Sequence, residues 1–125
     1  MNGKVMRSKT LLALGAIIEA LMGLALTFHP ALVVRLLLGG ALSGAGLALG
    51  RVAGFGLLSL GLACWPRAGA ALPAIQAMFT YNLLATVYLA YLRLGGELVG
   101  RLLLPAIVLH AVLALLFARA WSKER

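Results

Sequence analysis

The chain has 125 residues, of which 63% are hydrophobic and only 11% are charged. Soluble domains carry about a quarter of charged residues, and a core of this length cannot hide so much apolar surface. The composition therefore excludes an ordinary soluble protein. It predicts a single transmembrane domain over residues 1–125, with room for four membrane-spanning helices and little else.

The net charge of +8 comes from basic residues that lie at the ends of the apolar segments. Nucleic-acid-binding proteins instead gather such residues on one helix face or in an aromatic-rich patch. We therefore expect no nucleic-acid partner, and anionic lipid headgroups are the expected partner. Cys64 is the only cysteine, which excludes an internal disulfide and a thiolate metal cluster.

The first predicted span covers residues 10–28 and follows a basic stretch, as a secretory signal would. Its apolar run is long for a signal core, so we interpret it as a retained helix that ends before Pro30. The next 35 residues, up to Pro66, are too many for one span and too few for two. Glycine and serine at 39–44 mark a break. They predict a short interfacial helix over 31–38 and a second span over 45–65.

The third and fourth predicted spans cover residues 73–92 and 101–121. Pro73 suits the first turn of a helix, where its missing N–H costs nothing, and Pro105 is tolerated in the first turns of a membrane-spanning helix. Glycines at 95–100 make the turn between the two spans. The predicted fold class is thus all-α: an integral membrane four-helix bundle with a short interfacial helix between spans one and two.

Four spans place both termini on one side of the membrane, and the basic residues divide unequally between the two sides. The terminal side carries Lys4, Arg7, Lys9, Arg67, Arg119, Lys123 and Arg125, and the opposite side carries Arg35, Arg51, Arg93 and Arg101. Because basic residues are enriched on the cytoplasmic side, this bias predicts that both termini are cytoplasmic.

Each predicted span carries a polar side chain near its middle, at a similar depth given a rise of about 1.5 Å per residue. These side chains are Glu19, Ser59, Asn82 and His110. Small residues occur four positions from several of them, for example Gly15 and Gly23 on either side of Glu19. Since small residues favour packed faces in membrane helices, we predict a midplane polar layer that faces the bundle and is a candidate proton or ligand site.

Glu19 is the most costly member of this layer, because hydrocarbon solvates a carboxylate poorly. In a structural interpretation it is protonated and hydrogen-bonded to Asn82 or His110, which fixes helix register. In a functional interpretation it exchanges a proton or binds a cation, with His110 as its proton partner. A water-accessible cavity at Glu19 would favour the second, and a dry, packed carboxyl the first.

Gly46, Gly50 and Gly54 form a doubled small-xxx-small pattern in the second span, which predicts close helix packing. The expected partner is span one of the same chain, and a homo-oligomer interface is the alternative.

The residues indicate no enzyme and no cofactor, since no catalytic triad, phosphate-binding loop or carboxylate pair can be assembled from three acidic residues. His29 lies about 15 Å from the level of His110, which argues against shared haem ligation, and no ligand set exists for another metal. Three tyrosines lie roughly along one side of span three. They predict packing and interface anchoring, with a quinone pocket as the alternative.

Two resemblances to known families bear on function. The stretch Leu14-Gly15-Ala16-Ile17-Ile18-Glu19 resembles the acid-bearing first span of small multidrug resistance transporters, and this implies that Glu19 is a coupling carboxylate. The match covers one helix only. The interfacial segment, the charge bias and the histidine in span four depart from that family's pattern, so we do not carry its transport role over.

The second resemblance covers most of the chain, from 30 to 121. It rests on Arg51-Val52-Ala53-Gly54, Gly61-Leu62-Ala63-Cys64-Trp65-Pro66, Tyr81-Asn82-Leu83-Leu84, and Pro105 with His110. In these motifs the chain resembles uncharacterised bacterial four-span proteins that are grouped as DoxX-like. The resemblance implies the four-span fold and a location in the cell inner membrane, and it implies no particular chemistry.

Three functional hypotheses follow from these features. The first is a small polytopic inner-membrane protein without catalysis, acting as an accessory or scaffold subunit with other membrane subunits or a second copy as partners. The first alternative is a proton-coupled carrier of a small molecule or ion that uses Glu19. The second alternative is a quinone- or redox-associated membrane subunit.

Overall fold

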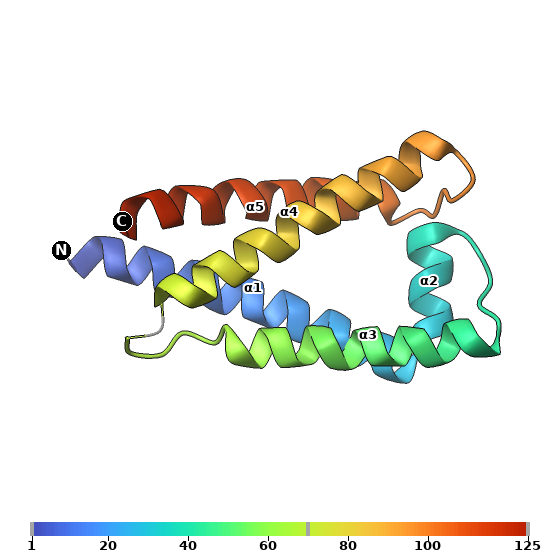
Figure 1. Cartoon of the computed structure of the whole chain (residues 1–125), viewed down its shortest axis with the longest axis horizontal. Coiled ribbons are helices and arrows are strands. Elements are labelled where there is room, and N and C mark those ends of the chain that lie inside the picture. The colour runs from blue at the N-terminus through green and yellow to red at the C-terminus, as the bar shows by residue number, and fades with distance from the viewer. Residues whose placement is uncertain (1, 70, 125) are drawn as a thin grey trace.

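The computed structural model describes residues 2–69 and 71–124, with side chains from Arg7 onward (Figure 1). These residues form five α-helices and no strand. The helices are α1 Asn2–Phe28, α2 Pro30–Leu38, α3 Gly44–Ala63, α4 Ala71–Gly95 and α5 Leu103–Glu124. All but α2 are long and apolar enough to cross a membrane. The predicted fold class, an all-α bundle of four long helices with a short helix between the first two, is confirmed.

The long helices extend beyond several of the predicted span ends. α1 begins at Asn2 instead of residue 10, α4 continues to Gly95 instead of 92, and α5 continues to Glu124 instead of 121. Hydropathy locates the point at which charged residues begin, whereas a helical backbone continues through polar residues until a residue of low helix propensity interrupts it. The predicted ends therefore mark the apolar part of each helix and not the whole helix.

The four long helices form two antiparallel pairs, α1 with α3 and α4 with α5, and contacts between the pairs are few. Both chain termini lie at one end of the molecule, here called the terminal end (Figure 1). From there the two pairs diverge toward the far end, where α2 runs crosswise between them.

The hydrophobic core lies at the terminal end, where the two pairs meet. Its buried residues are Leu12, Ala16, Cys64, Ala74, Ile75, Met78, Leu113, Phe117 and Ala120. Gly15 makes room for the largest of them, because a Cβ at this position would lie 2.9 Å from Cζ of Phe117. The absence of a side chain on α1 thus lets the aromatic ring from α5 enter the core.

A line of glycines brings α1 and α3 close together within this one chain. A Cβ at Gly54 would lie 2.7 Å from the carbonyl oxygen of Gly23, and a Cβ at Gly61 would lie 2.6 Å from that of Ala16. Such distances leave no space for a side chain, so the two backbones are in direct contact. This seam is what holds the first pair, since lipid gives apolar helices little reason to associate other than close packing.

The helix α2 is fixed at both of its ends. Pro30 occupies its first turn, and Gly39, with φ of 77°, ends it by donating its N–H to the carbonyl of Arg35 at 3.0 Å. The loop before α5 docks onto this end, because the N–H of Leu102 donates to the carbonyl of Leu36 at 2.9 Å. Gly100 lies against the same stretch of backbone and has no space for a side chain. α2 is thereby tied to both helix pairs.

Candidate ligand-binding crevice

Two of the predicted midplane residues form a hydrogen-bonded pair between α4 and α5. The Nδ1 atom of His110 lies 2.7 Å from Oδ1 of Asn82. The other end of the Asn82 amide donates from Nδ2 to the carbonyl oxygen of Met78 at 2.9 Å. Asn82 is fully buried, whereas His110 is half-buried. The pair therefore presents the imidazole toward the space beside it.

The protonation pattern of His110 follows from these partners. A backbone carbonyl only accepts hydrogen bonds, so the Met78 carbonyl must face the amino end of the Asn82 amide. Oδ1 of Asn82 then faces the imidazole and accepts a proton from Nδ1. In the neutral imidazole this leaves Nε2 as a hydrogen-bond acceptor, and no described residue donates to it.

His110 lines a crevice of about 420 Å³ that receives side chains from all five helices. Almost all of the lining is apolar, and it includes Leu26 of α1, Val34 of α2 and Leu57 of α3. The crevice occupies the region where the two helix pairs have diverged and α2 has entered between them. It is within the volume range of small-molecule sites in proteins, about 300–1,000 Å³.

Tyr81 is the second polar residue on the crevice wall. Its ring meets that of His110 edge to face, with centroids 5.7 Å apart and an interplanar angle of 82°. No described residue forms a hydrogen bond with its hydroxyl group. The crevice thus combines a mainly apolar lining with the polar groups of Tyr81, Tyr88 and His110 from two neighbouring helices, which is the usual composition of a site for a small amphipathic molecule.

The crevice opens on the outer surface of the bundle. Leu84 and Tyr88 line it and are 63% and 61% exposed, and both lie well inside the apolar part of α4. In a bilayer this surface faces lipid. A molecule dissolved in the membrane would reach the crevice sideways, without crossing the protein.

Glu19 occupies a different position from the one that its depth alone suggested. It is 1% exposed, does not line the crevice, and its Oε1 atom has no hydrogen-bond partner. The expected hydrogen bond to Asn82 or His110 is not formed.

Ser59, the fourth member of the predicted layer, does not join it. Its side chain is exposed, and its hydroxyl donates to the carbonyl of Phe55 in the preceding turn at 2.8 Å. A serine that bonds its own helix in this way needs no partner from another helix. The expectation that it faces the bundle is therefore wrong, and the polar layer reduces to the Asn82–His110 pair with Glu19 packed separately.

The predicted packing glycines also differ from one another. Gly15, Gly23 and Gly54 lie at helix contacts, as described above. Gly50 faces Pro30, where a Cβ would lie 2.9 Å from the proline Cβ, and Gly46 faces only the flexible side chain of Leu42.

From the sequence, Tyr81, Tyr88 and Tyr91 were predicted to pack and to anchor the interface, with a quinone pocket as the alternative, and Gly61 had no predicted packing role. The spacing of Tyr81 and Tyr88 by two helical turns, with Ala85 between them, is the signal for a shared face. These three residues do line the crevice together, and Tyr91 does not.

Comparison of the chain with protein families, with curated proteins and with solved structures gives no match.

Proposed function

We propose that this protein is a membrane protein that binds a lipophilic molecule with a hydrogen-bonding ring as its head group, with quinones as the chemical class that fits best. One observation carries the proposal. The crevice that opens toward lipid is lined by apolar side chains together with His110, Tyr81 and Tyr88, and neither Nε2 of His110 nor the Tyr81 hydroxyl has a hydrogen-bond partner among the described residues.

The hydroxyl of Tyr81 and the imidazole of His110 suit the oxidised and the reduced form of a quinone, respectively. The Tyr81 hydroxyl can donate to a quinone carbonyl, and Nε2 of His110 can accept from the hydroxyl of the reduced form. The ring and first isoprenoid carbons fit a volume of about 420 Å³, while the rest of the chain can remain in the bilayer. Binding of this kind requires no catalytic group, so the proposed role is that of an accessory subunit rather than an enzyme.

The proposed setting is a bacterial inner membrane, with both termini in the cytoplasm. The charge bias of the sequence supports this orientation, because seven basic residues belong to the terminal side and four to the other. The shared location of the two termini at one end of the molecule is consistent with it (Figure 1).

The burial of Glu19 supports a binding role over a proton-coupled carrier. A coupling carboxylate must alternate between access to the two sides, whereas Glu19 is 1% exposed and does not line the crevice. Its depth in the bundle favours a structural part in the contact between the two helix pairs.

Titration of the purified protein in nanodiscs with a short-chain ubiquinone tests the proposal. We expect saturable binding, and Tyr81→Phe should weaken it about fivefold, because one hydrogen bond contributes about 1 kcal/mol. Tyr91→Phe is the matched control, since Tyr91 is on the same helix outside the crevice. Uptake equal to that of empty nanodiscs, or equal affinity of the two variants, would refute the proposed site.

A second variant tests whether the ligand occupies the volume of the crevice, whereas Tyr81→Phe tests a single hydrogen bond. Ala106 lines the crevice, and Ala106→Phe should fill it and abolish binding. Val108→Phe is the control, because Val108 is on the same helix and 54% exposed. If both variants unfold at the wild-type temperature and both still bind, the ligand occupies another place.

A further inference from the structure

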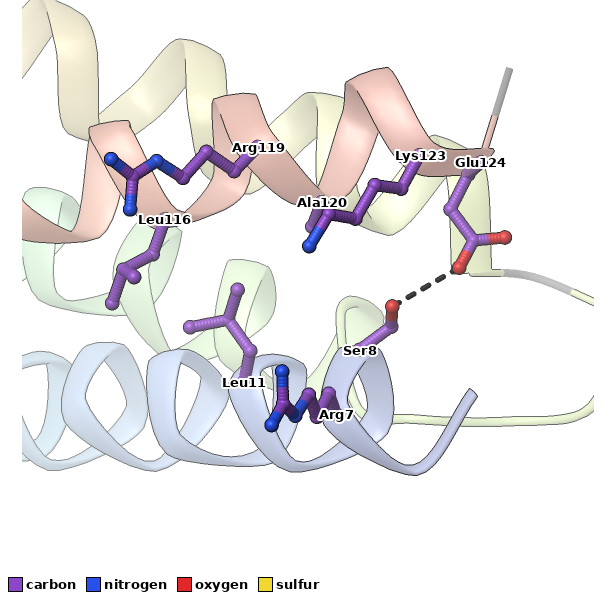
Figure 2. A pocket seen from close by; sticks show the side chains of 8 residues that line it. All are labelled: Arg7, Ser8, Leu11, Leu116, Arg119, Ala120, Lys123 and Glu124. Atoms are coloured by element: carbon purple, nitrogen blue, oxygen red, sulfur yellow. Dashed lines mark hydrogen bonds between the residues drawn. The ribbon is translucent and has the colours of Figure 1, made fainter. Parts of the chain in front are cut away.

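A second cavity lies at the terminal end, between α1 and α5, and its lining is unlike that of the crevice. It has a volume of about 410 Å³ and is bordered by Arg7 of α1 and by Arg119 and Lys123 of α5. Figure 2 shows the Lys123 side chain reaching into the space between the two helices. Three cations from two helices thus converge on one cavity.

The one acidic residue beside these cations offsets only one of their three charges. Glu124 also lines the cavity, but its Oε1 accepts a hydrogen bond from the hydroxyl of Ser8 at 3.0 Å (Figure 2). Among the residues that the structure describes, no ion pair joins Arg7, Arg119 or Lys123 to a carboxylate. The side chains around the cavity therefore carry a net charge of +2.

The backbone positions of the two leucines that line the cavity are further into the bundle than those of the basic residues. Leu11 is about one turn further into the span than Arg7, and Leu116 is about one turn further in than Arg119. Figure 2 shows the two leucines on facing helices. A ligand here meets the charges of Arg7 and Lys123 toward the end of the helices and the two leucines further in, while the Arg119 side chain extends to the level of Leu116 (Figure 2).

We propose that this cavity binds the phosphate headgroup of an anionic membrane lipid, with its acyl chain starting along Leu11 and Leu116. Free phosphate shares the headgroup chemistry but has nothing to place against the leucines. The cavity lies where the charged ends of α1 and α5 meet the headgroup region of a bilayer, and basic residues at that level attract anionic lipids. The proposal is independent of the crevice, which lies further along the bundle.

Native mass spectrometry of the detergent-solubilised protein with added phosphatidylglycerol or phosphatidylcholine tests this site. We expect one retained phosphatidylglycerol, and the double variant Arg119→Gln/Lys123→Gln should weaken its binding at least tenfold. The matched control is Lys9→Gln/Arg67→Gln, which removes the same charge from the same side without touching the cavity. The control should stay within about twofold of wild type.

Three outcomes would overturn the proposal. Equal weakening in the two double variants would indicate diffuse attraction instead of a site. If phosphatidylcholine is retained as well as phosphatidylglycerol, the site does not distinguish an anionic headgroup from a zwitterionic one. If inorganic phosphate at millimolar concentration displaces the lipid completely, the site binds free phosphate. Lys123→Glu alone, at an exposed helix end, repeats the test with a single change and should also weaken phosphatidylglycerol binding.

Discussion

At the scale of single residues, Glu19 and the Asn82–His110 pair show two ways of placing polar groups in an apolar bundle. Asn82 has partners for both ends of its amide, and it fixes the orientation of the imidazole. Glu19 is equally buried, but its Oε1 has no partner. A buried polar atom without a hydrogen bond costs about 1–3 kcal/mol, so Glu19 lowers the stability of the fold that contains it.

Replacement of Glu19 by an apolar residue of similar volume should therefore stabilise the protein. We expect Glu19→Met to raise the free energy of unfolding by about 1–3 kcal/mol, because it removes an unpaired buried group and keeps the packing. Glu19→Gln should leave the fold intact. Denaturant unfolding in micelles, followed by circular dichroism, measures both.

Glu97→Met is the control for this prediction. Glu97 is exposed in the loop before α5, and its replacement should change stability by less than about 0.5 kcal/mol. A loss of stability in Glu19→Met would show that the carboxyl has a favourable partner, and the structural account of Glu19 would then be wrong.

The sequence predicted the depth of the polar residues better than their direction. Counting along each span placed Asn82 and His110 at one level, and the structure joins them by a hydrogen bond. The same counting could not give the rotation of α3, which turns Ser59 outward. The small-xxx-small glycines did predict that the second span packs against the first, and α1 and α3 are in close contact. Depth alone could not show that Glu19 forms no hydrogen bond with the Asn82–His110 pair.

At the scale of the helices, glycines differ according to what lies opposite them. Gly54 and Gly56 are two residues apart on α3 and therefore point to different sides. A Cβ at Gly54 would lie 2.7 Å from backbone atoms of α1, whereas a Cβ at Gly56 would have no atom within 4 Å. The small-xxx-small pattern included Gly54 in its prediction, but it also included Gly46, where the atoms nearest to an added Cβ belong to the side chain of Leu42.

This difference leads to a paired prediction. Gly54→Ala should push α1 and α3 apart and lower the free energy of unfolding by about 2 kcal/mol or more, since backbone atoms cannot move aside as a flexible side chain can. Gly56→Ala should be neutral or stabilise the protein by up to about 1 kcal/mol, because alanine has the higher helix propensity. Thermal unfolding of the two variants in the same detergent compares them directly.

If Gly54→Ala and Gly56→Ala change the stability equally, the close contact of α1 and α3 at Gly54 is contradicted. Helix propensity alone would then explain both changes. Ser59→Ala gives a further reference on the same helix, since Ser59 is exposed and bonds only its own backbone. Its effect should be smaller than that of Gly54→Ala.

At the scale of the whole molecule, the arrangement is decided by which helices pair. The short connection between α3 and α4 suggests neighbours, yet the main contacts are α1 with α3 and α4 with α5. Hydropathy cannot reveal this, because it treats all faces of a span alike. In lipid the hydrophobic effect does not determine which helices pair. The close glycine contacts therefore determine the pairing of α1 with α3, and the Asn82–His110 hydrogen bond determines that of α4 with α5. The crevice follows from the divergence of the two pairs.

The topology of the whole chain can be tested with single cysteines in a Cys64→Ala background. Ser122 lies at the terminal end and Ser43 precedes α3 at the far end, and both are exposed. With both termini cytoplasmic, a membrane-impermeant maleimide should label Ser43→Cys in intact cells. It should label Ser122→Cys only after the membrane is permeabilised, because the terminal side carries the larger number of basic residues.

Arg67→Cys and Glu97→Cys extend the test to the loops, since Arg67 lies between α3 and α4 and Glu97 between α4 and α5. Arg67→Cys should behave as Ser122→Cys does, and Glu97→Cys as Ser43→Cys does. Labelling of all four from one side would contradict four spans. The reverse pattern would keep the spans but invert the protein, and the cavity formed by Arg7, Arg119 and Lys123 would then face the outer leaflet. The accessible side of one cysteine thus also decides which leaflet must supply the anionic lipid.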